Sequence, residues 1–262
     1  MGVIAFLTDF GTRDHYVGAM KGAALTICPG ATLVDITHDI APHDILAGAL
    51  ALAAAWKYFP PATIFVAVVD PGVGTSRRGI AAAAGDYRFV APDNGILTLV
   101  FRETAPSLIV ELSNPRYRRD EVSRTFEGRD RFAPAAAWLA AGVELAELGR
   151  PVRDYHQLEV PAPRVTASAI EGLVLGVDRF GNLVTNIERQ IVERFADGRA
   201  VRVSAASQAV GALVGTYAQA PDGAACALFG SSDRLEIAVN GASAAERLGL
   251  SPGAAVVVER AR

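Results

Sequence analysis

The sequence predicts two domains: an α/β amino-terminal domain with a mainly parallel sheet, and a smaller all-β barrel as the carboxy-terminal domain. Up to about residue 160, apolar β-branched runs alternate with alanine-rich helical runs. This alternation is typical of parallel sheets that are covered by helices. After Pro161-Ala162-Pro163 the apolar runs become short and turn residues separate them, as in small barrels. We therefore expect the domains to span residues 1–163 and 164–262.

Composition indicates a soluble globular protein that acts on a small molecule. Apolar residues make up 51% and charged residues 20%, and the formal net charge is −3. No basic stripe is present, which argues against a nucleic-acid partner. The longest apolar stretch, Ile45–Trp56, is too short to span a bilayer, and the first residues lack the features of a signal peptide. We expect a cytoplasmic protein without a membrane partner.

Cysteine and histidine spacing gives no sign of a metal centre. Cys28 and Cys226 lie too far apart in the sequence to indicate a disulfide framework or zinc-ligand spacing. The four histidines are scattered and form no His-x-x-x-His pair. We therefore expect no metal site.

Five strands and three helices are expected in the first domain. Asp14 and Asp44 are candidate N-caps for the first two helices, of which the second extends to about Tyr58. The third helix is expected to start after Asp130 and to run to Ala141. The expected strands are Val3–Leu7, Thr32–Ile36, Thr63–Val69, Arg88–Ala91 and Leu108–Leu112.

The second domain is expected to contain six short strands and no helix. Turn residues bound every one of these runs. The runs are Gly172–Val177, Leu183–Ile187, Ala200–Ser204, Ala224–Phe229, Leu235–Val239 and Ala254–Glu259.

Two carboxylates stand where expected strands end. Asp9 follows the first strand and Asp70 follows the third. Ligands of open α/β sheets bind beyond the carboxyl ends of the strands. We therefore expect Asp9 and Asp70 to share a site.

Several polar clusters interrupt the apolar segments, and each has a simple structural explanation when taken alone. DPG is a turn signal, PDNG is a good hairpin turn, Asp130 could cap a helix and DRFGN could form a β-turn. The chain contains no Walker A motif, no GxGxxG after a strand and no GxSxG elbow. The clusters are TDFGTRD (8–14), DPGVGTSRR (70–78), PDNG (92–95), TFEGRDRFAP (125–134), DRFGN (178–182) and SSDRLEIAVNGAS (231–243).

The order of these clusters, together with DITHDIAPHDI (35–45), resembles the S-adenosylmethionine hydroxide adenosyltransferases. The resemblance runs from Phe6 to about Ala244. This family shares its fold with the fluorinases and chlorinases. The resemblance implies an α/β domain followed by a β-barrel, and a homotrimer whose active sites lie between neighbouring subunits. The implied activity is hydrolysis of S-adenosylmethionine to adenosine and L-methionine, without a cofactor.

The resemblance assigns the handling of water to Asp70, Arg77 and Glu127. Asp70 and Arg77 match two members of the hydrolases' set, in which the carboxylate orients a water and accepts its proton. Glu127 departs from the pattern, because the hydrolases have His in a TFHGRD motif and the halogenating relatives have Tyr. We expect Glu127 to act as a hydrogen-bond acceptor for the water. The alternative is that activity is slow or that the task has changed.

The resemblance also implies a set of substrate-binding residues. Asp9 would accept hydrogen bonds from both ribose hydroxyls, and His43 would flank the substrate unless it is merely an exposed side chain. The remaining roles are as follows: Asp178 and Ser232 for the methionine ammonium and carboxylate, Phe180 and Asn182 for adenine, Tyr217 as an aromatic wall, and the backbone near Asn240 and Ala242 for the adenine edge.

Three other functions remain open from the sequence. A change at position 127 could leave a protein that binds S-adenosylmethionine or adenosine with little turnover. A relative that uses halide is disfavoured, because Asp70 and Glu127 would place negative charge where an anion must lose its water. A metal-dependent phosphatase is the weakest alternative.

Overall fold

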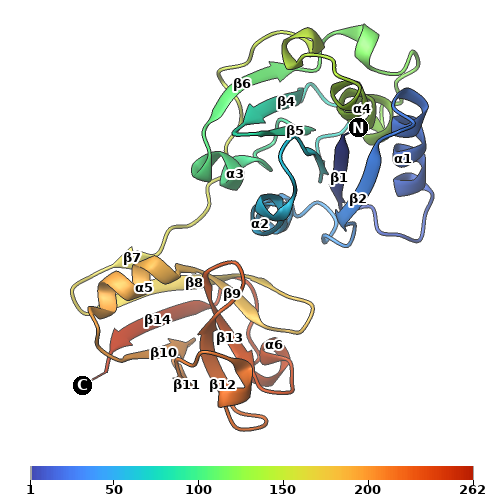
Figure 1. Cartoon of the computed structure of the whole chain (residues 1–262). Coiled ribbons are helices and arrows are strands. Elements are labelled where there is room, and N and C mark those ends of the chain that lie inside the picture. Colours follow the sequence, from blue (N-terminus) through green and yellow to red (C-terminus); the bar gives the residue numbers. More distant parts are fainter. Residues whose placement is uncertain (1, 262) are drawn as a thin grey trace. The chain divides into compact units, whose positions relative to one another are not determined.

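The computed structural model describes residues 2–261, and the chain divides into two compact units (Figure 1). One unit ends at Glu159 and the other begins at Val160. The boundary expected between residues 163 and 164 falls in the extended segment that follows, and its exact position stays a prediction.

A six-stranded mixed sheet forms the centre of the amino-terminal unit, in the order β2-β1-β3-β5-β4-β6. The pairs β1–β2, β1–β3 and β3–β5 are parallel, whereas β4 pairs antiparallel with both β5 and β6. The strands are β1 (Val3–Thr8), β2 (Thr32–Thr37), β3 (Ile64–Val68), β4 (Gly79–Ala84), β5 (Tyr87–Pro92) and β6 (Pro106–Glu111).

The expected mainly parallel sheet is therefore corrected to a mixed one, because β4 was missed. Its sequence, Gly-Ile-Ala-Ala-Ala-Ala, is rich in the residue with the highest helix propensity. All six residues are buried, however, as in a strand that is covered on both faces. PDNG consequently follows β5 and leads toward α3 (Thr98–Glu103), so it does not form a hairpin turn.

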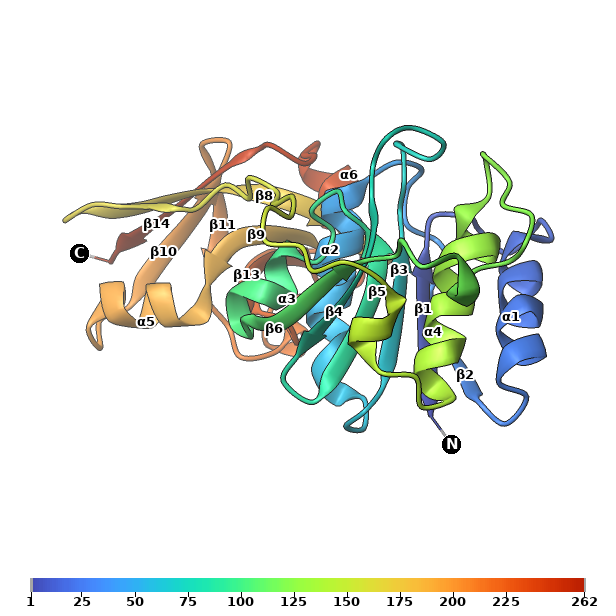
Figure 2. The same ribbon diagram turned by 90° about the horizontal axis from the view of Figure 1, so that it is seen from above.

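Helices cover both faces of this sheet (Figure 2). The core on one face joins Met20 and Ala24 of α1 to the alanines of α4 and to strand residues such as Phe6 and Val66. The helices are α1 (Tyr16–Ile27), α2 (Ile45–Ala55), α3 and α4 (Ala133–Ala140), with shorter turns η1 (Trp56–Tyr58), η2 (Pro115–Tyr117), η3 (Gly128–Phe132) and η4 (Leu145–Leu148).

Of the three expected helix caps, one is confirmed and two are wrong. The Asp44 side chain accepts a hydrogen bond from the Ala47 N–H at 2.9 Å and caps α2. At α1 the N-cap is His15, which makes no side-chain capping bond, so Asp14 does not have the expected role. Asp130 is no cap, because it is fully buried inside the π-helical turn η3.

The carboxy-terminal unit is a nearly closed, barrel-like sheet in the order β11-β10-β14-β8-β9-β13-β12, with β7 paired to β8. A bridge between Leu213 and Ala227 joins the segment after β11 to β12. The strands are β7 (Arg164–Val165), β8 (Ala169–Val177), β9 (Leu183–Glu188), β10 (Val201–Ala205), β11 (Gln208–Ala212), β12 (Ala225–Phe229), β13 (Arg234–Val239) and β14 (Ala255–Arg260).

Two helices and a 3-10 turn correct the expectation of an all-β domain: α5 (Arg189–Ala196), α6 (Ala244–Leu248) and η5 (Tyr217–Gln219). Val192 and Phe195 of α5 are buried in the same core as the inward residues of β13, Leu235 and Ile237. Among residues 2–261, no helix combines the length and the apolar content that crossing a membrane requires.

Candidate active site

Asp9 and Asp70 lie at the same edge of the amino-terminal sheet. Strands β1 and β3 are parallel neighbours, and Thr8 at the end of β1 pairs with Val68 at the end of β3. Asp9 follows Thr8 directly, and Asp70 comes two residues after Val68. The sheet therefore carries both carboxylates to its carboxyl edge, where α/β proteins bind ligands.

The loop after β3 folds Arg77 back onto Asp70. Its first turn is closed by the Val73 N–H, which donates to the Asp70 carbonyl at 3.3 Å, and a second turn follows at Gly72 and Thr75. The Arg77 Nε–H donates to Asp70 Oδ1 at 3.1 Å, and Nη2 donates to the other carboxylate oxygen. This two-point contact fixes both the position and the plane of the Asp70 carboxylate.

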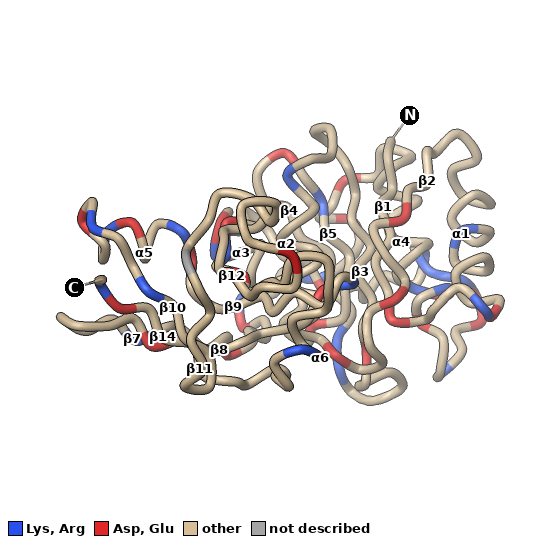
Figure 3. Tube along the Cα trace, turned by 90° about the horizontal axis from the view of Figure 1, so that it is seen from below, with Lys and Arg blue, Asp and Glu red and all other residues tan. Residues whose placement is uncertain are grey.

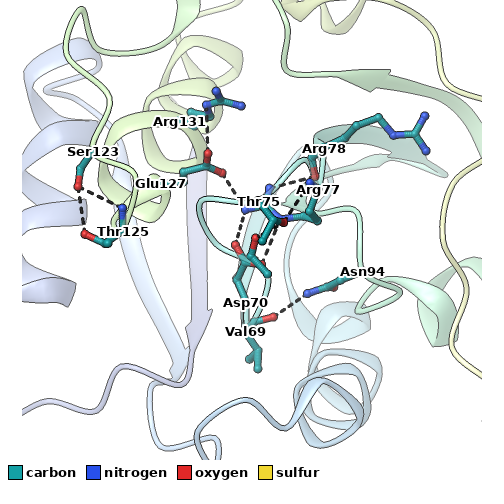
Figure 4. Close-up of polar contacts among 11 residues, drawn as sticks. Val69, Asp70, Thr75, Arg77, Arg78, Asn94, Ser123, Thr125, Glu127 and Arg131 are labelled. Carbon is teal, nitrogen blue, oxygen red and sulfur yellow. Dashed lines mark hydrogen bonds and ion pairs between the residues drawn. The ribbon is translucent and has the colours of Figure 1, made fainter.

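Arg77 also bonds to Glu127 and so joins all three expected catalytic residues (Figure 4). Its Nη2 donates to Glu127 Oε2 at 2.7 Å. The three side chains are only 5%, 9% and 9% exposed for Asp70, Arg77 and Glu127. Two carboxylates thus share one guanidinium in a site from which water is largely excluded.

Burial changes the acidity of Asp70. It raises the pKa of the Asp70 carboxyl above the ordinary value of 3.8, the charge and hydrogen bonds of Arg77 oppose this shift, and the charge of Glu127 adds to it. A carboxylate with a raised pKa holds a proton more strongly, which suits a general base.

Glu127 precedes a wide helical turn. The π-helix η3 is closed by the Ala133 N–H, which donates to the Gly128 carbonyl. Turns of this kind are rare and often occur at functional sites. Inside it, the buried Asp130 accepts from the Ser123 N–H at 2.8 Å and from Arg129 Nε at 2.7 Å. Burial opposes the effect of these bonds, which nevertheless hold the pKa of Asp130 below its ordinary value.

The Asp9 turn is held by residues to which the sequence analysis gave little or no role. Asp9 Oδ2 accepts the His43 N–H at 2.8 Å, and His43 has a left-handed φ of 68°. The Thr8 hydroxyl lies 2.7 Å from Nδ1 of the buried His38, whose carbonyl accepts the Gly11 N–H. His38 lies in the DITHDI cluster, and a histidine two residues after the expected strand Thr32–Ile36 was the signal for it.

In the carboxy-terminal unit, Asp178, Phe180 and Asn182 share one turn between β8 and β9. Asp178 Oδ1 accepts the N–H groups of Phe180 and Asn182, both at 2.8 Å, and Oδ2 accepts the Asn182 amide at 2.9 Å. DRFGN thus forms a turn, and Gly181 has the positive φ of 85° that such a turn requires. Phe180 is 79% exposed, so its ring is available for stacking.

Glu236 is a buried carboxylate that the sequence analysis missed. The Tyr217 hydroxyl donates to Glu236 Oε2 at 3.3 Å, and a Cβ on Gly230 would fall 1.7 Å from Oε1. Burial raises the pKa of Glu236, and the negative charge of Asp178 adds to the shift. An acidic residue within the apolar run RLEIAV was the signal for this position.

Of the other expected substrate-binding residues, Asn240 and Ala242 already make hydrogen bonds within the protein. Ser232 is half-buried in the turn before β13. The side-chain amide of Asn240 donates to the Ala220 carbonyl at 2.8 Å, and the Ala242 N–H donates to the Val239 carbonyl at 3.2 Å. The role of these two residues at an adenine edge stays a prediction.

A polar cavity of about 460 Å³ opens beside Arg77, and neither Asp70 nor Glu127 is among its lining residues. Its lining includes Ser76, Arg77, Arg78, Asp93 and His156. Arg78 Nη2 lies 2.6 Å from Asp93 Oδ2, so the next arginine in the sequence is held by an ion pair of its own. The space beside Arg77 therefore has polar walls with fixed charges.

Acidic and basic positions are interspersed along the chain (Figure 3). Cys28 and Cys226 are free thiols, of which Cys226 is buried. Within residues 2–261, no group of three or more His, Cys, Asp or Glu side chains is placed to hold a metal ion.

The fold and the ion-paired group define a two-domain protein with a charged site at the carboxyl edge of an α/β sheet. Two consecutive family domains match the chain: the SAM hydroxide adenosyltransferase N-terminal domain over residues 4–149 and the C-terminal domain over residues 172–257. The chain therefore belongs to the S-adenosylmethionine (SAM) hydroxide adenosyltransferase family, as the sequence motifs indicated.

Named relatives cover nearly the whole chain. An (R)-S-adenosyl-L-methionine hydrolase of Thermus thermophilus is 40% identical, over 97% of this chain and 98% of the relative. A protein of the same name from Salinispora tropica is 39% identical over 95% of each chain. A fluorinase of an Actinoplanes species is 32% identical, over 99% of this chain and 98% of the relative.

A solved structure has the same fold. The crystal structure of an uncharacterized conserved protein from Thermotoga maritima aligns with a TM-score of 0.93 at 37% identity. The alignment covers 98% of this chain and 100% of that protein.

Proposed function

We propose that the protein hydrolyses S-adenosyl-L-methionine to adenosine and L-methionine. The observation that carries the proposal is the buried Asp70–Arg77–Glu127 group at the sheet edge that also holds Asp9. The hydrolase names of relatives about 40% identical support it. Those names specify the R configuration at sulfur, so this epimer is the proposed substrate.

The reaction is an in-line substitution at the ribose C5′. The oxygen of a water attacks C5′, the C5′–S bond breaks, and its electron pair stays on sulfur, so methionine leaves as a neutral thioether. The proton that the water loses goes to the Asp70 carboxylate, whose raised pKa favours acceptance. Glu127 orients the water as a hydrogen-bond acceptor, and Arg77 holds both carboxylates in place.

Substrate binding is assigned to both units. Asp9 accepts bonds from the ribose hydroxyls, with its position fixed by the His43 N–H. Exposed Phe180 stacks on adenine beside Asn182, and Asp178 with Ser232 binds the two charged groups of methionine. Tyr217 provides a second aromatic wall, and the backbone near Asn240 and Ala242 contacts the adenine edge.

A halide-using activity is the second candidate, because fluorinases are among the relatives. Two buried carboxylates argue against it, since a halide beside them would lose its hydration next to two negative charges with which Arg77 is already paired. A protein that only binds SAM is the third candidate, and turnover distinguishes it from the hydrolase.

The test is a chromatographic assay of the purified protein with each epimer of SAM, in chloride-free buffer and then with added halide. Adenosine and methionine should form in equal amounts without halide, and an Asp70→Ala variant should form neither. Halide-dependent formation of a halogenated nucleoside would support the second candidate. Bound nucleoside without turnover would support the third.

Assembly, location and cofactor use are further parts of the proposal. The resemblance implies a homotrimer with active sites between neighbouring subunits and an activity that needs no cofactor, and we further propose a cytoplasmic location. Light scattering after size-exclusion chromatography tests the trimer, and activity in the presence of a chelator tests the independence from metals.

A further inference from the structure

The side chain of Arg131 directs a buried donor toward Glu127. Arg131 Nε is buried and has no hydrogen-bond acceptor among the described residues. It lies 3.6 Å from Glu127 Oε1, which is longer than a direct hydrogen bond. The dashed line in Figure 4 marks this pair, on the side of Glu127 opposite Arg77.

The contact adds a positive charge beside the carboxylates of Asp70 and Glu127. Asp70 and Glu127 are both more than nine-tenths buried, yet they share only one guanidinium, that of Arg77. Two carboxylates close together cannot easily both stay ionised, and a buried charge without a partner is costly. Arg131 is a second cation in contact with this group. The guanidiniums of Arg77 and Arg131 together balance the two carboxylates.

The local helix geometry produces the contact. Glu127 immediately precedes η3, and Arg131 lies four residues later inside that turn. Residues with this spacing lie on one face of a helix. The Arg131 side chain as a whole is 29% exposed, but its Nε, the atom nearest to Glu127, is buried.

We propose that Arg131 is a positioning residue that allows a glutamate to work at position 127. Where the family motif has His, a neutral imidazole brings no charge and needs no counter-ion. A glutamate at the same place needs a counter-ion. Arg131 supplies a positive charge beside Oε1 of Glu127 and keeps the carboxylate in one orientation, while Arg77 bonds to Oε2. This inference rests on the proposed hydrolase function.

A double-mutant cycle tests the proposal on the full-length protein. The four forms are the unmodified protein, Arg131→Met, Glu127→His and the double variant. Because Arg131 acts through Glu127, Arg131→Met should lower kcat about tenfold or more and change KM little, since coupled neighbours interact strongly. In the Glu127→His background, where no counter-charge is needed, the same replacement should cost much less.

Two further variants separate this role from a general effect on folding. Arg131→Lys keeps the charge without the Nε donor and should recover part of the lost kcat. Arg194→Met, on an exposed position of α5, is the control for loss of a surface arginine. Circular dichroism melting of every variant reports whether the fold persists.

The outcomes decide between the inference and the function on which it rests. Equal loss of kcat in both backgrounds, or no loss in either, would overturn the positioning role while leaving the hydrolase intact. Absence of turnover in the unmodified protein would contradict the proposed function and the inference together. If Arg131→Met fails to fold, Arg131→Lys in the two backgrounds gives the same comparison.

Discussion

The guanidinium of Arg77 lies over the ring of Phe132, with 5.4 Å between its central carbon and the ring centroid. Phe132 is fully buried in η3, so the packed core lies directly beneath the candidate catalytic group. A guanidinium over an aromatic face is attracted by the ring and loses freedom of movement. The position of Arg77, and with it that of both carboxylates, therefore depends on the packing of Phe132.

Gly79→Ala tests this dependence. A Cβ on Gly79 would fall 2.8 Å from Phe132 Cε1, so the ring must move away from its place under Arg77. We expect a loss of about 1–3 kcal/mol in the free energy of unfolding, measured in urea, together with a lower kcat. Gly22→Ala is the control, because Gly22 is exposed on α1 and a Cβ there would meet no atom within 4 Å. If kcat of Gly79→Ala equals that of the unmodified protein, Arg77 does not depend on the ring.

The pH dependence of activity should follow Asp70. Its pKa is raised above 3.8, and the proposed reaction needs the ionised form, so kcat/KM should fall as the pH falls through this raised value. The effect on stability has the opposite sign. The folded state binds the proton more tightly than the unfolded state, so the contribution of Asp70 to stability decreases as the pH rises from 3.8 through the folded pKa.

Asp70→Asn should remove that part of the pH dependence and lower kcat about 100-fold or more, because the amide cannot accept the proton. The pH series of kcat/KM and of unfolding free energy measures both effects. Asp197→Asn, at the exposed C-cap of α5, provides the matched control. An acid limb that is unchanged in Asp70→Asn would assign the titration to another group.

Asp130→Asn should destabilise the fold by about 2 kcal/mol, because it removes the charge of a buried carboxylate that is hydrogen-bonded to the partly exposed Arg129. Asp130 is fully buried and bonded to Arg129 and to the Ser123 N–H. Its pKa is depressed, so its stabilising contribution is present above the ordinary value of 3.8 and is lost as the pH falls through the folded pKa. Guanidinium unfolding at neutral pH measures the loss, with the exposed Asp120→Asn as control. A loss below about 1 kcal/mol would mean that the pair contributes little net stability.

His38→Ala should weaken nucleoside binding. His38 supports the Asp9 turn through its ring contact with Thr8 and its carbonyl bond to Gly11. A buried hydroxyl left without its partner costs about 1–3 kcal/mol, so we expect the Kd for adenosine to rise about tenfold. Calorimetry of adenosine binding measures this, and Tyr58→Ala, which removes an exposed aromatic ring, serves as the comparison. Equal affinity in both variants would show that the Asp9 turn keeps its shape without His38.

Elements with strong local signals could be predicted from the sequence. The apolar runs that became β1 and β3 end at Thr8 and Val68, and this was sufficient to place Asp9 and Asp70 at one sheet edge. Asp70 and Arg77, which the resemblance assigned to one site, lie seven residues apart across a Pro-Gly turn and form an ion pair. Both relationships depend on residues close in sequence or on the ends of neighbouring strands.

The features that were missed depend on strand pairing and burial, which local propensity does not reveal. The alanines of β4 favour a helix locally, and only pairing with β5 and β6 makes them a strand. Asp130 resembles a helix cap, but its partners bury it instead. Helix α5 is different, because the apolar spacing of Ile191, Val192 and Phe195 was visible in the sequence and its prediction as non-helical was an avoidable error.

The proposed mechanism is tested by a reaction with (R)-S-adenosyl-L-methionine in water enriched in oxygen-18, analysed by mass spectrometry. Attack of water at C5′ predicts one heavy oxygen in the 5′-hydroxyl of adenosine and none in methionine. Adenosine without the label, or no adenosine from a folded protein, would contradict the proposed mechanism.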